Sequence, residues 1–213
     1  MVLTMVCVST AAAQSTESGQ KTGRAYVGGN LAFASFNGEW LVAYGAGTGS
    51  REGNYDLARS TAVGVALGVR VHRGELEIAY SRASHDATLT NATGSGHQVT
   101  VQRVGLDTRF FLRRTGQAHP YILLAFGGQW HDPTAGDFTG TSLLDESKLT
   151  MSFGTGGGLV LDVAPRVSIV GGVSRRWEWG SVTTIHTSTA APSSTKEITG
   201  TATDIVVAAR FHF

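Results

Sequence analysis

The chain has 213 residues, of which 41% are hydrophobic, 15% are charged and 28 are glycine. This length suits a single β-domain, and no stretch reaches the roughly 18 apolar residues that a helical membrane span needs. The formal net charge of +1 argues against a nucleic-acid partner, which normally requires a clustered basic surface.

Residues 1–23 are predicted to lie outside the folded domain. Residues 1–13, MVLTMVCVSTAAA, form an apolar stretch that ends in small residues, which is typical of a secretory signal peptide removed before Gln14. The only cysteine, Cys7, lies in this segment, so the mature chain is predicted to have neither a disulfide nor thiol chemistry. Residues 14–23 are polar and aperiodic and are interpreted as a flexible lead-in. The folded domain is then residues 24–213.

Eight segments of this domain alternate between apolar and polar or small residues, with the period of two that is typical of a β-strand. They cover residues 25–36, 60–72, 75–82, 99–113, 121–130, 149–163, 167–177 and 201–213. Each has about the 9–11 residues of a tilted transmembrane strand, and the third is marginal. In the fourth, Val99 and Val101 have the parity opposite to the later apolar residues. This predicts a bulge near Gln102–Arg103 or a shorter strand.

The connections between these segments are of two kinds, which alternate strictly along the chain. Three are short: His72–Gly74, Arg114–His119 and Ala164–Arg166. Four are long and polar: Asn37–Arg59, Ala83–Gln98, His131–Lys148 and Glu178–Gly200. In an up-and-down barrel the short turns then lie at one rim and the long loops at the other. The sequence therefore predicts an all-β fold, a closed antiparallel up-and-down transmembrane β-barrel of eight strands.

The charged residues in the middle of the segments share the face opposite the apolar residues. They are Arg70, Glu77, Asp107, Arg109, Asp162, Arg176, Asp204 and Arg210. An arginine on the lipid face would cost about 2–4 kcal/mol, whereas the interior of an eight-stranded barrel is filled by side chains. Buried charges must pair, so we predict a polar, largely plugged interior. A purely structural role is the first interpretation of this network, and a path for protons or ions is the alternative.

Aromatic residues near the segment ends are interpreted as girdles at the membrane surfaces. Those toward the long loops are Tyr80, Trp130, Trp177 and Trp179, and those toward the short turns are Phe110, Phe211 and Phe213. Arg82 and Arg175 face outward at the long-loop ends of their segments. There they can reach the interface or the phosphates of lipopolysaccharide.

One motif favours catalysis. His186-Thr187-Ser188 has the His-x-Ser spacing of outer-membrane lipid A deacylases, with Glu197 downstream as a carboxylate that could orient the histidine. This tripeptide lies in a Ser/Thr-rich loop, and Thr189 stands where those enzymes usually have asparagine. We therefore predict that the protein is not an enzyme and has neither a cofactor nor a metal site.

The closing segment IVVAARFHF resembles the last strand of small OmpA/OmpX-like outer-membrane β-barrels. AYVGGNLAFA, YILLAFGGQW and APRVSIVGGVSRRW resemble the first, fifth and seventh strands of that family. The resemblance covers residues 24–213 and implies a bacterial outer-membrane protein exported through the periplasm. It also implies that Phe213 and Phe211 form the signal read by the outer-membrane assembly machinery. Outer-membrane lipid and lipopolysaccharide are the other partners that it implies.

These motifs specify architecture and leave three classes of function open. The first is a structural or surface-interaction barrel whose long loops contact a ligand, with Asn37–Arg59 as the most apolar loop. The second is a narrow, OmpW-like transporter of small or hydrophobic molecules. The third is a lipid A-modifying enzyme. On fold, a soluble lipocalin-like barrel is an alternative that requires an apolar interior, whereas here the charged face carries the glycines.

Overall fold

The computed structural model describes residues 23–38, 40–44, 51–71, 73–89, 97–113, 116–133, 148–184 and 194–213. The strands are β1 (Arg24–Gly38), β2 (Trp40–Tyr44), β3 (Arg51–Leu57), β4 (Ser60–Val71), β5 (Gly74–Leu89), β6 (His97–Phe111), β7 (Ala118–Pro133), β8 (Lys148–Ala164), β9 (Val167–Thr184) and β10 (Ser194–His212). Among these residues, no helix is long and apolar enough to cross a membrane. The predicted signal peptide, and all of the lead-in except Gly23, lie outside the described residues.

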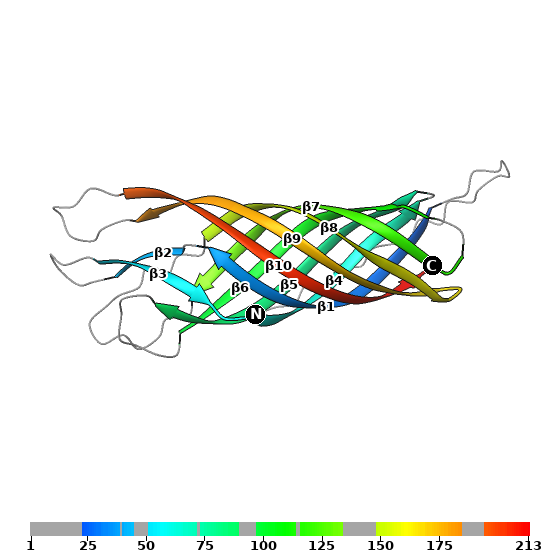
Figure 1. Cartoon of the computed structure of the whole chain (residues 1–213), viewed down its shortest axis with the longest axis horizontal. Coiled ribbons are helices and arrows are strands. Elements are labelled where there is room, and N and C mark those ends of the chain that lie inside the picture. Colours follow the sequence, from blue (N-terminus) through cyan, green and yellow to red (C-terminus); the bar gives the residue numbers. More distant parts are fainter. Residues whose placement is uncertain are drawn as a thin grey trace, which may run out of the picture.

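Eight of the strands close into a ring. Their order is β1, β4, β5, β6, β7, β8, β9 and β10, each antiparallel to the next, and β1 pairs with β10 to complete the barrel. Figure 1 shows the tilted strands wound around a common axis, with the C-terminus at the end opposite the β2–β3 hairpin. The prediction of a closed, eight-stranded, antiparallel up-and-down barrel is confirmed.

The two ends of the barrel differ in their connections. At one end, which we call the short-turn rim, lie the connections between β4 and β5, β6 and β7, and β8 and β9. Gly116, in the second of these, has φ 95°, a backbone conformation that favours glycine. The opposite end, which we call the long-loop rim, carries β2 and β3, and β3 pairs with β5 through Tyr55–Leu57.

The outer surface of the barrel is a band of exposed apolar side chains. On β4 every outward residue from Val63 to Val71 is exposed, whereas the inward Ala62 and Ala66 are buried. Leu31, Ile78, Phe126 and Ile205 continue the band around the ring. Soluble proteins rarely expose an apolar surface of this extent, and lipid hydrocarbon is the solvent in which it is stable. The alternative of a soluble, lipocalin-like barrel is therefore wrong.

The strands extend further toward the long-loop rim than the sequence predicts. The third predicted segment ends at Arg82, but β5 continues to Leu89 with exposed Ser84 and Asp86 alternating with buried His85 and Ala87. The predicted Asn37–Arg59 loop likewise contains β2 and β3. The apolar alternation ends where the outer face leaves the lipid, but backbone hydrogen bonding continues into water. The sequence therefore marks the edge of the membrane and not the end of the strand.

The bulge predicted near Gln102–Arg103 is absent. β6 pairs with β5 and with β7 in uninterrupted register through this region, and the strand is not shortened. Val99 and Val101 are buried inside the barrel, with 6% and 8% exposure. At this level the inner face carries these two valines beside the buried polar side chains of His85 and His131. A register shift does occur between β8 and β9, at Asp162 and Ala164.

Glycines make room for two inward tyrosines. A side chain at Gly68 would collide with the ring of Tyr26, and one at Gly172 would collide with the hydroxyl of Tyr121. Gly158 lies opposite Gly172 across the β8–β9 pair and is close to the same hydroxyl. These glycines allow bulky polar side chains to cross a narrow barrel.

Candidate functional site

The half of the interior near the short-turn rim is filled by polar and aromatic side chains. We call this cluster the plug, and it consists of Tyr26, Glu75, Glu77, Arg109, Tyr121 and Arg210. These residues come from β1, β5, β6, β7 and β10, and each is 5% exposed or less. The plug therefore joins strands from opposite sides of the barrel.

The arginines and glutamates of the plug neutralise one another. Nη2 of Arg210 donates to Oε2 of Glu77 at 2.7 Å, and its Nη1 donates to Oε2 of Glu75. Arg109 Nη2 donates to Oε1 of Glu77 at 3.0 Å. The Tyr26 hydroxyl donates to Oε2 of Glu77 at 2.9 Å. Glu77 thus accepts bonds from three side chains, which is what a buried carboxylate requires to remain charged.

The tyrosine rings cover the guanidinium groups. The Arg210 guanidinium carbon lies 4.7 Å from the centre of the Tyr26 ring, and that of Arg109 lies 5.6 Å from the centre of the Tyr121 ring. Contacts of this kind between a cation and an aromatic face are stabilising, and more so when the pair is desolvated. The plug is therefore closed by ring faces as well as by ion pairs.

The ionic network continues from the plug to the short-turn rim. Arg70 Nε lies 3.4 Å from Oε1 of Glu75, and Arg70 Nη1 donates to Oδ1 of Asp162 at 2.7 Å. His119 Nε2 lies 2.9 Å from Oδ2 of the same Asp162. Since the Asp162 side chain keeps about a third of its surface exposed, this part of the network reaches water.

The other half of the interior contains a cavity of about 80 Å³, which we call the chamber. Alanines from three strands form much of its wall, namely Ala32, Ala34, Ala62, Ala66, Ala79 and Ala83. Its volume is enough for a few water molecules. The short alanine side chains thus leave a cavity toward the long-loop rim. Toward the short-turn rim, the larger side chains of the plug fill the interior.

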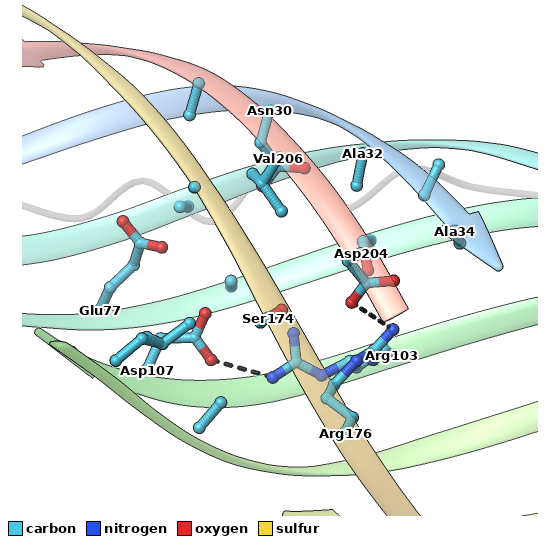
Figure 2. A pocket seen from close by; sticks show the side chains of 18 of the residues that line it. Asn30, Ala32, Ala34, Glu77, Arg103, Asp107, Ser174, Arg176, Asp204 and Val206 are labelled. Carbon is cyan, nitrogen blue, oxygen red and sulfur yellow. Dashed lines mark hydrogen bonds and ion pairs between the residues drawn. The ribbon is translucent and has the colours of Figure 1, made fainter. Parts of the chain in front are cut away.

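Two ion pairs border the chamber (Figure 2). Arg103 Nη2 donates to Oδ1 of Asp107 at 2.9 Å, and Arg176 Nη2 lies 2.7 Å from Oδ2 of Asp204. Nε of Arg176 and Oδ1 of Asp204 are buried without a protein partner. Unpaired buried polar atoms of this kind are usually satisfied by ordered water, and the chamber has the volume to hold it.

A second polar cluster lies beyond the chamber, nearer the long-loop rim. Gln129 Nε2 donates to Oε2 of Glu178 at 3.0 Å, and His131 Nε2 lies 3.7 Å from the same oxygen. The Phe36 ring meets the His131 ring edge-on at 6.0 Å between centroids. Among the described residues, no group of three or more His, Cys, Asp or Glu side chains could hold a metal ion.

The eight charged residues singled out from the sequence all face the interior, but they do not form one cluster. Glu77, Arg109 and Arg210 belong to the plug. Arg70 and Asp162 pair near the short-turn rim, whereas Asp107, Arg176 and Asp204 border the chamber. Arg109 Nη2, 3.9 Å from Oδ2 of Asp107, links the plug to the chamber. A function for this network beyond holding the barrel together stays a prediction.

Three charged residues of the described interior were not in the predicted set of eight: Glu75, Arg103, which the alternation had placed on the inner face, and Glu178. The alternation places the first two on the inner face, because Glu75 shares the face of Glu77 and Arg103 shares the face of Asp107. Glu178 was assigned to a loop, although it lies between outward Trp177 and Trp179 and is buried in β9. Continuing the alternation past the last apolar pair would have found it.

The predicted girdle residues lie on the outer surface at the long-loop side. Tyr80, Trp177 and Trp179 are exposed, and Trp130 is partly exposed. The Tyr80 hydroxyl donates to Gln102 Oε1 at 2.9 Å, and Arg175 lies 5.9 Å from the centre of the Trp177 ring. The outer face turns polar at this level, as at a membrane interface. The girdle role, and the assembly signal at Phe211 and Phe213, stay predictions.

A closed barrel with an apolar exterior and a charged interior defines the class of membrane-spanning up-and-down β-barrels. Neither a protein-family model nor a curated protein sequence matches the chain. Solved structures do match. Neisserial surface protein A is 14% identical with a TM-score of 0.52, over 89% of this chain and 97% of that protein.

Two further outer-membrane proteins are similar to the chain in structure. OprG from Pseudomonas aeruginosa is 10% identical with a TM-score of 0.57, covering 92% of this chain and 98% of OprG. AlkL, solved in lipid bilayers, is 13% identical with a TM-score of 0.54, covering 96% and 97%. The chain therefore has the fold of the small outer-membrane β-barrels, and the resemblance seen in its sequence is confirmed. The predicted outer-membrane location agrees with this fold and with the apolar band.

Proposed function

We propose that the protein is an integral outer-membrane barrel with a structural or surface-interaction role, closed to solutes and offering its long-loop rim to partners. The plug is the observation that carries this proposal. Arg210, held between Glu75 and Glu77, is buried in the barrel interior together with Tyr26 and Tyr121. Opening a passage would require separating buried ion pairs, which costs several kcal/mol.

The extension of the strands beyond the apolar band supports a role at the surface. The β9–β10 pair continues from Trp179 and Thr199 to Thr184 and Ser194. The β2–β3 hairpin adds a further ordered element at the same rim through its pairing with β5. Function in this proposal resides in contacts made by that rim, with lipopolysaccharide or with a surface ligand.

Conductance in planar bilayers tests closure. We expect no current above background for the purified barrel, because the plug leaves no continuous lumen. Steady ionic current from the unaltered protein would contradict the proposal.

For the surface role, we expect that shortening residues 90–96, 134–147 and 185–193 to Gly-Ser turns abolishes ligand or phage adsorption to expressing cells. A shortened barrel that still folds and adsorbs as well as the parent would argue against it.

The chamber favours a second candidate, a narrow transporter of small or hydrophobic molecules. Its alanine walls and the adjoining Val101 and Val206 offer an apolar surface beside Arg103 and Arg176. Uptake of a small apolar solute into cells that express the barrel, compared with cells that lack it, measures this activity. Uptake that persists when Ala34→Trp fills the chamber would show that the solute does not pass through it.

We also propose that the protein is not an enzyme. His186-Thr187-Ser188 lies outside the described residues, so support comes only from Thr189, which replaces the usual asparagine. Mass spectra of lipid A from cells with and without the gene test this proposal directly. We expect identical profiles, and a change that Ser188→Ala abolishes would show that the barrel is a lipid A enzyme.

A further inference from the structure

Four exposed arginines are distributed around the short-turn rim. They are Arg24 at the start of β1, Arg73 before β5, Arg113 after β6, and Arg166 between β8 and β9. The described carboxylate side chains at this end, Glu75 and Asp162, both take part in interior ion pairs. In the described part of the rim, four arginines are exposed, and Asp162 is the one carboxylate side chain that is partly exposed.

Two of these arginines flank a hollow of about 260 Å³. It is lined by Arg24, Pro165, Arg166, His212 and Phe213. Nη1 of Arg24 donates to the Pro165 carbonyl at 3.3 Å, and the His212 backbone N–H donates to the Arg166 carbonyl at 2.8 Å. These bonds hold the start of β1, the end of β10 and the β8–β9 turn together. The Arg24 guanidinium and the backbone of Arg166 are thus fixed on either side of the hollow.

Lipid-facing side chains lie directly beside this basic surface. Leu112, which precedes Arg113, is 66% exposed, and Phe213 in the wall of the hollow is 62% exposed. An apolar band places the acyl chains of a lipid, so the arginines at its edge lie at the level of the headgroups. In outer-membrane barrels the short turns face the periplasm, and the lipid at that level belongs to the periplasmic leaflet.

We propose that the hollow between Arg24 and Arg166 binds the phosphate of an anionic phospholipid in the periplasmic leaflet. Guanidinium groups bind phosphate oxygens with two parallel hydrogen bonds. An acidic periplasmic protein would meet the same charges, but it would leave the exposed Phe213 ring in the wall of the hollow without a role, because that side chain matches an acyl chain. The occupant that fits both the charge and the apolar edge is a lipid.

Native mass spectrometry of the full barrel in a neutral detergent tests this. The probes are phosphatidylglycerol and phosphatidylcholine with the same acyl chains. We expect the unaltered protein to retain phosphatidylglycerol preferentially. A basic residue near an anionic surface contributes roughly fivefold in affinity, so the pair R24Q/R166Q should lower retention roughly twentyfold. The matched control is R59Q, which removes one exposed arginine toward the long-loop rim and should leave retention unchanged, whereas R24Q alone should lower retention roughly fivefold.

Three further arms complete the experiment. Heat-modifiable migration on a gel establishes that each variant is folded, and R24K/R166K, which keeps the charge but not the paired hydrogen bonds, should bind more tightly than R24Q/R166Q and less tightly than the unaltered protein. Equal retention of the two lipids, or unchanged retention in R24Q/R166Q, would overturn the proposal. So would free glycerol phosphate or a polyglutamate peptide that binds as tightly as phosphatidylglycerol, because the ligand would then be a soluble phosphate or an acidic polymer.

Discussion

The two halves of the barrel interior are built from the same strands but differ in the size of their side chains. Toward the short turns, Arg109, Arg210 and two tyrosines fill the cross-section, and glycines on facing strands make room for them. Toward the long loops, alanines line the wall and leave the chamber. The size of the inward side chains, and not the diameter alone, therefore decides whether an eight-stranded barrel is closed.

The largest expected effect comes from breaking the plug. Arg210→Met should destabilise the barrel by about 3–5 kcal/mol, because it leaves the charges of Glu75 and Glu77 without their main partner. Arg176→Met, which removes the partner of Asp204 beside the chamber, should cost less since water can reach that carboxylate. Urea unfolding in lipid vesicles measures both. Equal costs for the two variants would mean that the two halves do not differ in solvation.

Two neighbouring glycines on β9 test how tightly the side chains of the plug are packed. Gly172→Val should cost about 1–3 kcal/mol, because the new side chain overlaps the Tyr121 hydroxyl in the plug. Its neighbour Gly171 faces outward, and a side chain there would meet no atom within 4 Å. Gly171→Val is therefore the control and should be neutral. The urea midpoints of unfolding of the two variants measure this difference. An unchanged midpoint for Gly172→Val would show that the plug is loosely packed.

The smallest effect is expected in the chamber. Ala83→Val adds two methyl groups to the chamber wall, where space exists, and valine suits a β-strand. Stability should change by less than about 1 kcal/mol. A loss as large as that of Gly172→Val, in the same unfolding assay, would show that the two halves are equally tight.

The sequence predicted the fold and the inward face because both depend on an alternation that lipid enforces along every strand. Asp204 and Arg210, for example, could only face inward in a strand whose other face is Ile205, Val207 and Phe211. The strand ends could not be predicted in the same way, because in water the outer face no longer needs apolar residues. Glu178 and the β2–β3 hairpin were therefore assigned to loops.

The division into plug and chamber was not predictable from the sequence either. The alternation of residues along a strand shows which side chains face the interior. It does not show at which level along the barrel axis the tilted strands bring two such side chains into contact. The contact between Arg210 and Glu75 depends on the stagger of β10, β1, β4 and β5 around the ring. Val99 and Val101 misled for a related reason, since apolar side chains on the inner face near the long-loop rim were not expected.

The accessibility of single cysteines to a small ion distinguishes a closed plug from a water-accessible chamber. In a Cys7→Ser background, Ala34→Cys places a thiol in the chamber wall, and Val170→Cys places one in the apolar cluster around Tyr121. The purified barrels in lipid vesicles are exposed to Ag⁺, and the remaining thiols are counted after unfolding. We expect the Ala34→Cys thiol to react rapidly and the Val170→Cys thiol to stay protected. Rapid reaction of both thiols would contradict a closed plug, and protection of both would contradict a water-accessible chamber.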